Sequence, residues 1–369
     1  MTARCPLTRL YTLDALRGIA ALCVVYWHWQ HFFYVGDNPA ALLITEQPFY
    51  ALFKPLYDHG ALAVQLFFSI SGFVFFWLYS RSITERQTLP LKFALDRFSR
   101  LYPLHLLTFG LVAVLQVAYS THHSSYFVYQ TNDWYHALLN LFLAPAWGLE
   151  KDWSFNAPIW SVSVEVLLYG SFFLICLSSR WKWLLAFAAG ALGLVLYPDS
   201  YKIGSGALCF YLGGMTYGLL ELLRRHLASG RIVILTTSLC VCSWLYLSLV
   251  TEPAESYIIM CVCFPLTLAM TAAVGFHWPE VMRSGAWLGD ISYSSYLLHF
   301  PLQIMFAIAS DWMGFSRAVF YQEWTMLLFF AVLVPLSLLC HRFVERPAQR
   351  YIRQSMSAGR QRAPRAAQT

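Results

Sequence analysis

Long apolar segments with few charges recur along the chain, and they restrict its fold more than any other feature. A helix needs about 20 residues to cross a hydrocarbon core about 30 Å thick. Backbone polar groups cannot stay unpaired in lipid, so such segments cross it as helices. The sequence therefore predicts an all-α polytopic membrane protein with about ten transmembrane helices, at residues 12–33, 60–80, 97–119, 158–178, 182–198, 204–223, 231–250, 256–276, 287–309 and 323–342.

The composition argues against several other classes of protein. Residues of the set AVILMFWYC make up 58% of the chain and only 12% are charged, whereas soluble domains contain about 45–50% apolar residues. So much apolar surface disfavours a two-domain soluble enzyme, a disordered chain and a nucleic-acid-binding module. The net charge of +6 fits a lipid bilayer better than nucleic acid as the partner.

The distribution of positive charge predicts the orientation. Lys and Arg residues of short loops are retained on the cytoplasmic side of a membrane. When ten helices are placed with both termini in the cytoplasm, most of the 25 Lys and Arg residues lie on that side. The outer side then holds only Lys54, Lys151, Lys202 and Arg317. We therefore expect a multi-pass plasma membrane protein with cytoplasmic N- and C-termini.

Two segments are expected to lie outside the spans. Residues 134–147 are apolar but short, and they contain Pro145, which favours an interfacial or re-entrant segment. Residues 351–369 follow the membrane domain at 1–350 and are rich in Arg. For these we expect a disordered cytoplasmic tail near anionic lipid headgroups.

Arg17 and His28 are ionisable residues within the first predicted span. Residues eleven apart on an α-helix differ by only about 20° in direction and are separated by about 16 Å along the axis. One helix face can thus carry a guanidinium near the cytoplasm and an imidazole in the outer half of the membrane. The structural alternatives are snorkelling of Arg17 to headgroups and an interhelical hydrogen bond of His28.

Glu165 is a carboxylate near the outer end of the fourth predicted span. Its predicted depth matches that of His28, so it could orient the imidazole or stabilise its protonated form. Ser161 is four residues before Glu165 and shares its helix face. The alternative is a structural carboxylate paired with any neighbouring donor.

Arg97 and Arg100 are three residues apart at the start of the third predicted span. They lie beside the positive end of the helix dipole, which suits a ligand that carries phosphate. The alternative is ordinary anchoring of the helix by positive charge on the cytoplasmic side.

His299 is predicted near the middle of the membrane, with Tyr296 on the same helix face and structural packing as the alternative. We expect no metal site in this chain. His28 and His31 have a spacing that could hold a metal, but no carboxylate joins them on that face. The Cys pairs of the apolar segments are two residues apart, so their thiols point in different directions on a helix.

Six short motifs occur in one order along residues 10–350, and together they resemble the acyltransferase 3 family of integral membrane acyltransferases. They are Leu13-Asp14-Ala15-Leu16-Arg17-Gly18 running to His28, Phe67-Phe68-Ser69-Ile70-Ser71-Gly72-Phe73, Arg97-x-x-Arg100-Leu101-Tyr102-Pro103, Trp160-Ser161-x-x-x-Glu165, Ile291-Ser292-Tyr293-Ser294 through His299, and Glu345-Arg346-Pro347.

The resemblance implies transfer of an acetyl or other short acyl group from cytoplasmic acyl-CoA to a hydroxyl of a cell-surface or exported polysaccharide, glycolipid or related acceptor. Acetyl-CoA is then a co-substrate, with no permanently bound cofactor, and the host membrane is a bacterial inner membrane. The activity of the family is associated with residues that match Arg17, His28, Arg97 and Arg100 here, and Glu165 is a further candidate.

Combined with the predicted topology, these motifs suggest one corridor across the membrane. The CoA phosphates would bind Arg97, Arg100 and Arg17, and the thioester would reach His28 as general base. A route through an acyl-histidine is equally open. The loop at 120–157 contains Trp153 among many aromatic residues, which suit stacking on a sugar or an interfacial belt. The rival functions are a proton-coupled transporter and a flippase of a surface-glycan precursor.

Overall fold

The computed structural model describes residues 9–40, 42–249 and 255–362, with side chains through residue 355. These residues are almost entirely helical, and two short strands, β1 (Tyr34–Val35) and β2 (Asn38–Pro39), pair antiparallel. The α-helices are α1 (Tyr11–Trp27), α2 (Tyr50–His59), α3 (Ala63–Leu78), α4 (Ser80–Thr84), α5 (Pro90–Ser120), α6 (Trp134–Leu141), α7 (Trp160–Leu177), α8 (Lys182–Leu196), α9 (Tyr201–His226), α10 (Ser229–Leu247), α11 (Glu255–Ile258), α12 (Phe264–His277), α13 (Ala286–Trp312), α14 (Glu323–Cys340) and α15 (Arg346–Arg362).

Short helices of other types connect them. The 3₁₀ helices are η1 (His28–Phe33), η2 (Ile44–Glu46), η3 (Gly60–Leu62), η4 (Ala157–Ile159), η5 (Ser179–Trp181), η7 (Arg283–Gly285) and η8 (Arg317–Tyr321). The π-helical turns are η6 (Ile259–Cys263) and η9 (His341–Glu345).

Each predicted span overlaps one of the α-helices, which confirms an all-α protein with several membrane-type helices. Within the described residues, seven helical segments are long and apolar enough to cross a membrane. Helices α1 and α8, with only 17 and 15 residues, and the longer α13 are not among these seven. The number of about ten crossings and the side of each terminus therefore stay predictions.

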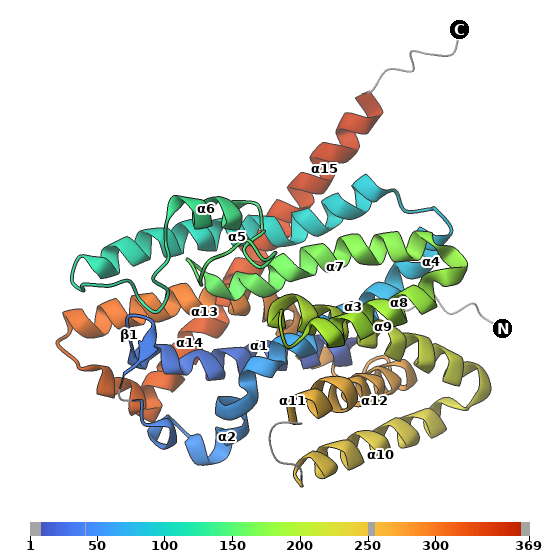
Figure 1. Ribbon diagram of the computed structural model, residues 1–369, viewed down its shortest axis with the longest axis horizontal. Coiled ribbons are helices and arrows are strands. Elements are labelled where there is room, and N and C mark those ends of the chain that lie inside the picture. The colour runs from blue at the N-terminus through green and yellow to red at the C-terminus, as the bar shows by residue number, and fades with distance from the viewer. Residues whose placement is uncertain (1–8, 41, 250–254, 363–369) are drawn as a thin grey trace.

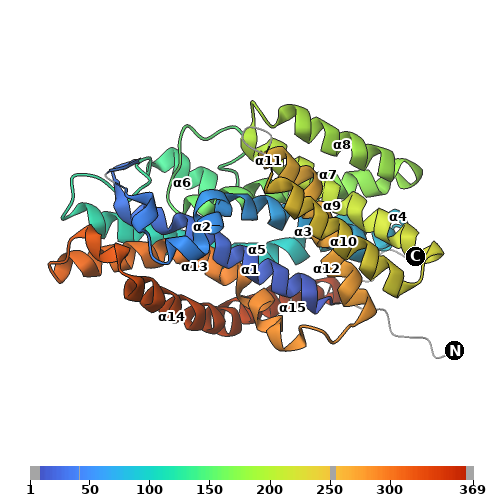
Figure 2. The same ribbon diagram turned by 90° about the horizontal axis from the view of Figure 1, so that it is seen from below.

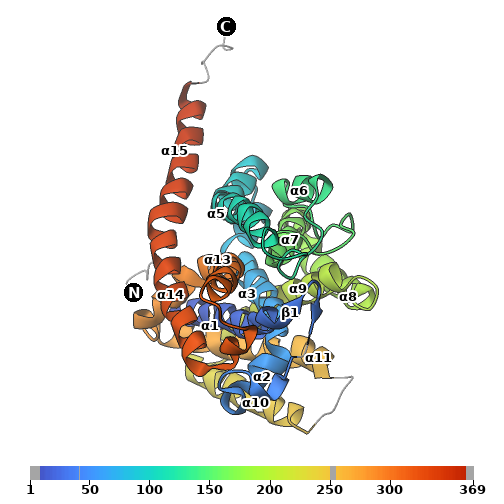
Figure 3. The same ribbon diagram turned by 90° about the vertical axis from the view of Figure 1, so that its left-hand side faces the viewer.

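Helix α1 is the central element of the bundle. It packs against α13, α3 and α12, and Figure 2 shows it between α3 and α13. Helix α3 packs on α9, α9 on α8, and α10 on α12. Helices α5 and α13 pack together, whereas α15 projects away from the bundle in Figure 1, as Figure 3 also shows.

Close contact between helices depends on glycine at two motif positions. A Cβ on Gly18 of α1 would lie 2.5 Å from the Leu288 carbonyl carbon of α13. A Cβ on Gly72 of α3 would overlap the Phe210 carbonyl of α9. Small residues of this kind let helix backbones approach where lipid supplies no hydrophobic driving force. These contacts fix α1 and α3 against the helices that complete the site.

Three segments differ from the sequence-based expectation or refine it. The regular part of the first helix ends at Trp27, and residues 28–33 form the 3₁₀ helix η1. Residues 134–147 contain α6, whose eight residues span only about 12 Å at 1.5 Å per residue. The expected disordered tail is helical through Arg362, because α15 continues from α14 through η9 without needing a new helix nucleus. Residues 363–369 lie outside the described residues.

Candidate active site

Two cavities lie at successive levels along α1. The first, here called the arginine cavity, has a volume of about 150 Å³ and is lined by Arg17, Ser71, Tyr79, Arg97, Arg100, Ser161, Glu165, Tyr169, Ser292, Tyr293 and Tyr296 with apolar residues of α3, α5 and α7. The second, the histidine cavity, has a volume of about 330 Å³ and is lined by His28, His31, Tyr34, Asp37, Tyr129, Asp152, Trp153, Trp160 and Tyr201 with Val24, Trp27, Ala61, Val64, Val128, Gln130 and Pro158.

Arg17 is held by α13 at the edge of the arginine cavity. Its Nε donates to the Ser292 hydroxyl at 2.9 Å, and one terminal nitrogen donates to the Gly289 carbonyl oxygen at 2.7 Å. The same nitrogen lies 3.7 Å from an Asp14 carboxylate oxygen. These contacts follow from the neighbouring Gly18, which lets α1 approach α13 closely. The guanidinium is thus fixed toward the cavity, unlike a snorkelling side chain.

Arg97 and Arg100 reach the arginine cavity from α5. Arg97 is only 9% exposed, donates to the Tyr79 hydroxyl at 2.8 Å and lies over the Phe75 and Phe93 rings. Its Nε is buried without a hydrogen-bond partner. Arg100 makes no hydrogen bond or ion pair with another described residue. Both guanidiniums therefore keep donors for an anionic ligand.

Glu165 also lies in the arginine cavity, and the expected contact with His28 is wrong. Its carboxylate accepts a hydrogen bond of 2.6 Å from the Ser71 hydroxyl on α3. The sequence predicts that the first residues of the fourth span, Glu165 included, lie at the same depth in the membrane as His28. In the structure, Pro158 and Trp160 line the histidine cavity while Ser161 and Glu165 line the arginine cavity. The boundary between the two cavities falls at the first turn of α7.

Ser161 and Tyr296 form this boundary. The Tyr296 hydroxyl donates to the Pro158 carbonyl oxygen at 2.7 Å and lies 2.9 Å from the Ser161 hydroxyl. The Phe67 ring packs against Tyr296 at a centroid distance of 5.8 Å. The two cavities share no lining residue, so the expected continuous corridor is interrupted here.

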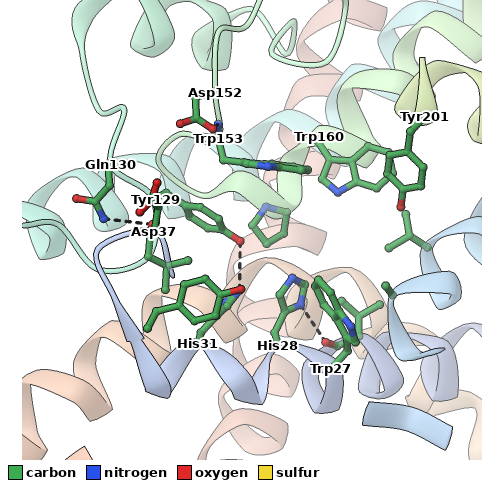
Figure 4. Close-up of a pocket in the computed structure, with 16 residues that line it drawn as sticks. Trp27, His28, His31, Asp37, Tyr129, Gln130, Asp152, Trp153, Trp160 and Tyr201 are labelled. Atoms are coloured by element: carbon green, nitrogen blue, oxygen red, sulfur yellow. Dashed lines mark hydrogen bonds between the residues drawn. The ribbon is translucent and has the colours of Figure 1, made fainter. Parts of the chain in front are cut away.

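His28 presents an unprotonated nitrogen in its neutral form. Its Nδ1 lies 2.9 Å from the Val24 carbonyl oxygen, and a carbonyl only accepts, so Nδ1 carries the hydrogen. Nε2 is then a free acceptor on a ring that lines the histidine cavity (Figure 4). This is the state that a general base requires.

His31 and His299 surround the His28 ring, at centroid distances of 4.6 and 4.8 Å. The amide nitrogen of Gln303 donates to the His28 carbonyl oxygen at 2.8 Å, which fixes the orientation of the amide group. The amide oxygen then faces His31 and accepts a hydrogen bond from its Nδ1 at 3.0 Å. His299 Nδ1 donates to the Tyr296 carbonyl oxygen at 2.6 Å, and its Nε2 is buried without a partner. All three imidazoles therefore carry hydrogen on Nδ1.

Aromatic residues form the wall opposite the histidines. Figure 4 shows Trp153 and Trp160 along one side, with Tyr129 between them and His31. The Tyr129 hydroxyl lies 3.5 Å from His31 Nε2. Lys202 of α9 lies 3.5 Å from the centroid of the Trp153 ring and forms an ion pair with Glu150. Burial raises the pKa of the Glu150 carboxyl, although Lys202 opposes this shift.

Within the part of the chain that the structure describes, no group of three or more His, Cys, Asp or Glu side chains is arranged to hold a metal ion. The imidazole Nδ1 atoms of His28 and His299 are occupied by backbone carbonyls.

Several residues of the site did not stand out in the sequence. From its spacing to His28, His31 suggests at most a weak metal ligand, Ser71 is one position of the second motif without a role of its own, and Gln303 belongs to no motif. Gln303 is four residues after His299, which was a usable signal because that spacing shares a helix face. Ser71 lies on α3 and meets Glu165 of α7, a contact that only the packing of the two helices determines.

Comparison with known proteins identifies the family. A family profile described as an acyltransferase domain matches residues 10–341, nearly the whole chain. The chain therefore belongs to the acyltransferase 3 family, which confirms the resemblance of its motifs. No solved structure matches the chain significantly.

Two curated proteins are similar to parts of the chain. Protein 2 in picA locus of Rhizobium radiobacter is 37% identical over 108 residues, which cover 29% of this chain and 46% of that protein. Acyltransferase MdmB of Streptomyces mycarofaciens is 33% identical over 171 residues, which cover 44% of this chain and 38% of that protein. The chain thus spans less than half the length of the curated relatives it matches.

Proposed function

We propose that this protein is a membrane acyltransferase that moves an acetyl or other short acyl group from acyl-CoA to an acceptor hydroxyl. The observation that carries the proposal is the His28 imidazole, whose unprotonated Nε2 lines an aromatic cavity one level along α1 from the arginine cavity. Family membership and the name of the relative MdmB support the same reaction class.

The arginine cavity suits the phosphates of the donor. Arg97 and Arg100 retain unused guanidinium donors, and Arg17 adds a third positive charge. Guanidinium binds phosphate through charge-assisted, bidentate hydrogen bonds. Glu165 balances part of this charge and is a positioning residue in this proposal. The pantetheine arm then extends along α1, past Ser161 and Tyr296. For the arm to pass, the hydrogen bond between the Tyr296 hydroxyl and the Pro158 carbonyl oxygen must break.

The reaction needs one base near the thioester. His28 Nε2 takes the proton of the acceptor hydroxyl as its oxygen bonds to the thioester carbonyl carbon. The carbon–sulfur bond then breaks, and the CoA thiolate receives the proton from His28. In the covalent alternative, His28 Nε2 itself attacks the carbonyl carbon, the carbon–sulfur bond breaks and CoA leaves as its thiolate. In a second step the acceptor oxygen displaces the imidazole, and the proton of the acceptor hydroxyl passes to the CoA thiolate.

The histidine cavity suits a carbohydrate-like acceptor. Trp153, Trp160 and Tyr129 supply flat rings that can stack on a sugar, and Asp37 and Asp152 supply acceptors for its hydroxyls. We propose a cell-surface or exported polysaccharide, glycolipid or related molecule as the class of acceptor. We also propose a bacterial inner membrane as the location, with both termini in the cytoplasm.

The test is acyl transfer by the purified full chain in nanodiscs, with labelled acetyl-CoA and an extract of surface glycans as acceptor. His28→Ala is expected to lower transfer by about 10²–10⁴-fold, the contribution of a general base, while the dissociation constant of acetyl-CoA changes little. Equal rates for the wild type and His28→Ala would refute the catalytic role and favour a transporter or flippase.

The donor site has its own test. Arg97→Ala is expected to weaken binding of acetyl-CoA at least tenfold, as the loss of a charge-assisted bond implies, and to leave acceptor affinity unchanged. Lys92→Ala is the matched control, because Lys92 is an exposed cation on the same helix that does not line the cavity. Equal weakening of donor and acceptor would contradict a phosphate role for Arg97.

A further inference from the structure

A third pocket of about 370 Å³ adjoins the arginine cavity and shares Arg17, Arg97 and Arg100 with it. We call it the mouth pocket. Its remaining charged lining includes Arg9 and Asp14 near the chain start, Asp290 of α13, Glu345 of η9 and Arg353 of α15. Arg353 lies beyond the segment that the family profile matches, so family membership assigns it no role.

Glu345 brings an unpaired carboxylate oxygen to this pocket. The residue is 4% exposed, and one oxygen lies 3.1 Å from His341 Nδ1. The other oxygen is buried without a hydrogen-bond partner. Glu345 ends the π-helical turn η9, and such turns often occur at functional sites. A buried acceptor without a partner is costly unless a ligand supplies the donor.

The guanidiniums of the mouth pocket differ in how fully they are neutralised. Arg9 forms ion pairs with Asp14 and Asp290. Arg353 lies 3.3 Å from an Asp96 oxygen, and its Nε donates to the Ser99 hydroxyl at 3.2 Å. The other terminal nitrogen of Arg353 makes no hydrogen bond or ion pair with a described residue, and the side chain is 47% exposed. Arg353 is therefore the peripheral cation that still has donors for a second phosphate.

We infer that the mouth pocket binds the adenosine 3′-phosphate end of the acyl-CoA donor, which rests on the proposed function. Arg353 binds the 3′-phosphate, and the free oxygen of Glu345 accepts a hydrogen bond from the 6-amino group of adenine. The diphosphate then lies between this end and the thioester, next to Arg97 and Arg100. The 3′-phosphate, the adenine and the diphosphate all branch from one ribose, and Arg353, Glu345 and the Arg97–Arg100 pair line one pocket that can receive all three.

A lipid headgroup that carries phosphate and amine offers the same chemistry. The test therefore measures binding by calorimetry to the full chain in nanodiscs of phosphatidylcholine alone, and again with phosphatidylethanolamine and phosphatidylglycerol added. The expected result is the same CoA affinity in both. Competition by the added headgroups, together with no discrimination between CoA and dephospho-CoA, would assign the pocket to lipid instead.

The 3′-phosphate contact is tested with CoA and dephospho-CoA, which lacks that phosphate. The wild type should bind CoA about tenfold more tightly, and Arg353→Gln should reduce this ratio to near one. Arg350→Gln is the matched control, because Arg350 is exposed on the same helix and does not line the pocket. The ratio of the two affinities is informative even if Arg353→Gln loosens α15, because a loosened helix weakens the binding of CoA and dephospho-CoA alike. An unchanged ratio would overturn the assignment of Arg353.

The adenine contact is tested with 1,N6-etheno-CoA, in which the amino group is blocked. The wild type should prefer CoA severalfold, and Glu345→Ala should lose this preference while keeping the preference for CoA over dephospho-CoA. A preference that survives in Glu345→Ala, with an unchanged thermal midpoint for the ligand-free chain, would overturn the assignment of Glu345.

These outcomes are separable from failure of the proposed function. If CoA binds with the expected discrimination but His28→Ala transfers acetyl as well as the wild type, the mouth pocket stands and the catalytic role of His28 falls. If transfer depends on His28 but neither variant changes its ligand preference, the acyltransferase stands and the adenosine site falls.

Discussion

At the scale of single residues, the candidate site is a set of neutral imidazoles whose hydrogen positions are fixed by carbonyl groups. Val24, Gln303 and Tyr296 each accept from an Nδ1 nitrogen, which directs the bare Nε2 atoms away from these acceptors. His28 differs from His299 because its ring lines the cavity, and from His31 because its Nε2 does not face the Tyr129 hydroxyl and it directly follows the helix that carries Arg17.

Gln303 is expected to act as a positioning residue for His28. Gln303→Leu removes the hydrogen bond to the His28 carbonyl and the one to His31, each worth about 1 kcal/mol. We expect kcat for acetyl transfer to fall about tenfold with KM for acetyl-CoA unchanged, measured by release of CoA from acetyl-CoA in the presence of acceptor.

The control for this prediction is Gln87→Leu, an exposed glutamine outside the bundle core. It should leave both kinetic constants unchanged. If Gln303→Leu raised KM for acetyl-CoA and left kcat as it was, Gln303 would belong to the donor site and not to the support of His28.

At the scale of elements, the close packing of α1 on α13 positions Arg17. Gly18→Ala would place a Cβ 2.5 Å from the Leu288 backbone, and the resulting separation of the helices should cost about 1–3 kcal/mol of stability. We expect a lower thermal midpoint in detergent and a weaker affinity for acetyl-CoA, because the Arg17 contacts to Gly289 and Ser292 lengthen.

The matched control is Gly110→Ala on α5, where a Cβ would meet nothing within 4 Å. Alanine is the better helix former by up to about 1 kcal/mol, so this variant should be neutral or more stable. Equal destabilisation by both substitutions would mean that Gly18 is not required for the approach of α1 to α13.

The short helix α6 is predicted to depend on the charge of its N-cap. Asp133 accepts from the His136 backbone N–H at 2.8 Å, and this bond, with the His136 side chain, lowers the pKa of the Asp133 carboxyl. A lowered pKa means that the cap contributes fully above the ordinary carboxyl pKa of about 3.9 and is lost as the pH falls through the folded value.

Hydrogen exchange of the α6 amides is the measurement. Protection in the wild type should decrease below about pH 4, whereas Asp133→Asn should keep its cap at every pH, since Asn is also a good N-cap. Comparison at equal pH removes the intrinsic pH dependence of exchange. Parallel curves for the two proteins would show that ionisation of Asp133 does not support α6.

At the scale of the whole molecule, the orientation and the number of crossings are testable together. Alkaline phosphatase fusions after Ser179 and after Asp199 should report opposite sides if α8 crosses the membrane, and fusions after Met282 and Gly314 should do so if α13 crosses. We expect activity only after Asp199 and Gly314, the two outer positions. Equal phosphatase activity within a pair would mean that the helix between its two positions, α8 or α13, does not cross the membrane.

The sequence predicted much of this fold because helix formation in an apolar chain is a local property. Each predicted span overlaps an α-helix, and the family profile extends over residues 10–341. Prediction failed where neighbouring elements decide, as at the C-terminal tail, where Arg353 and Arg346 join α15 to Asp96 of α5 and Asp290 of α13.

For the candidate site, the sequence selected residues but not their neighbours. Arg17, Arg97 and Arg100 converge on one cavity as expected, and His28 lies further along α1. The predicted contact between Glu165 and His28 is wrong. The depth of a residue along a helix axis does not show that the Tyr296 side chain separates the cavity of Glu165 from the cavity of His28.

The sequence by itself determined the helices, their apolar character and the chemical groups carried on α1, α5 and α7, because these follow from hydropathy, helix periodicity and motif order. Only the tertiary structure decided that the arginines and the histidines occupy separate cavities, that Gln303 fixes the hydrogen of His31, and that a free carboxylate oxygen of Glu345 joins the mouth pocket. Those features depend on contacts between residues far apart in the chain, which side-chain packing alone sets.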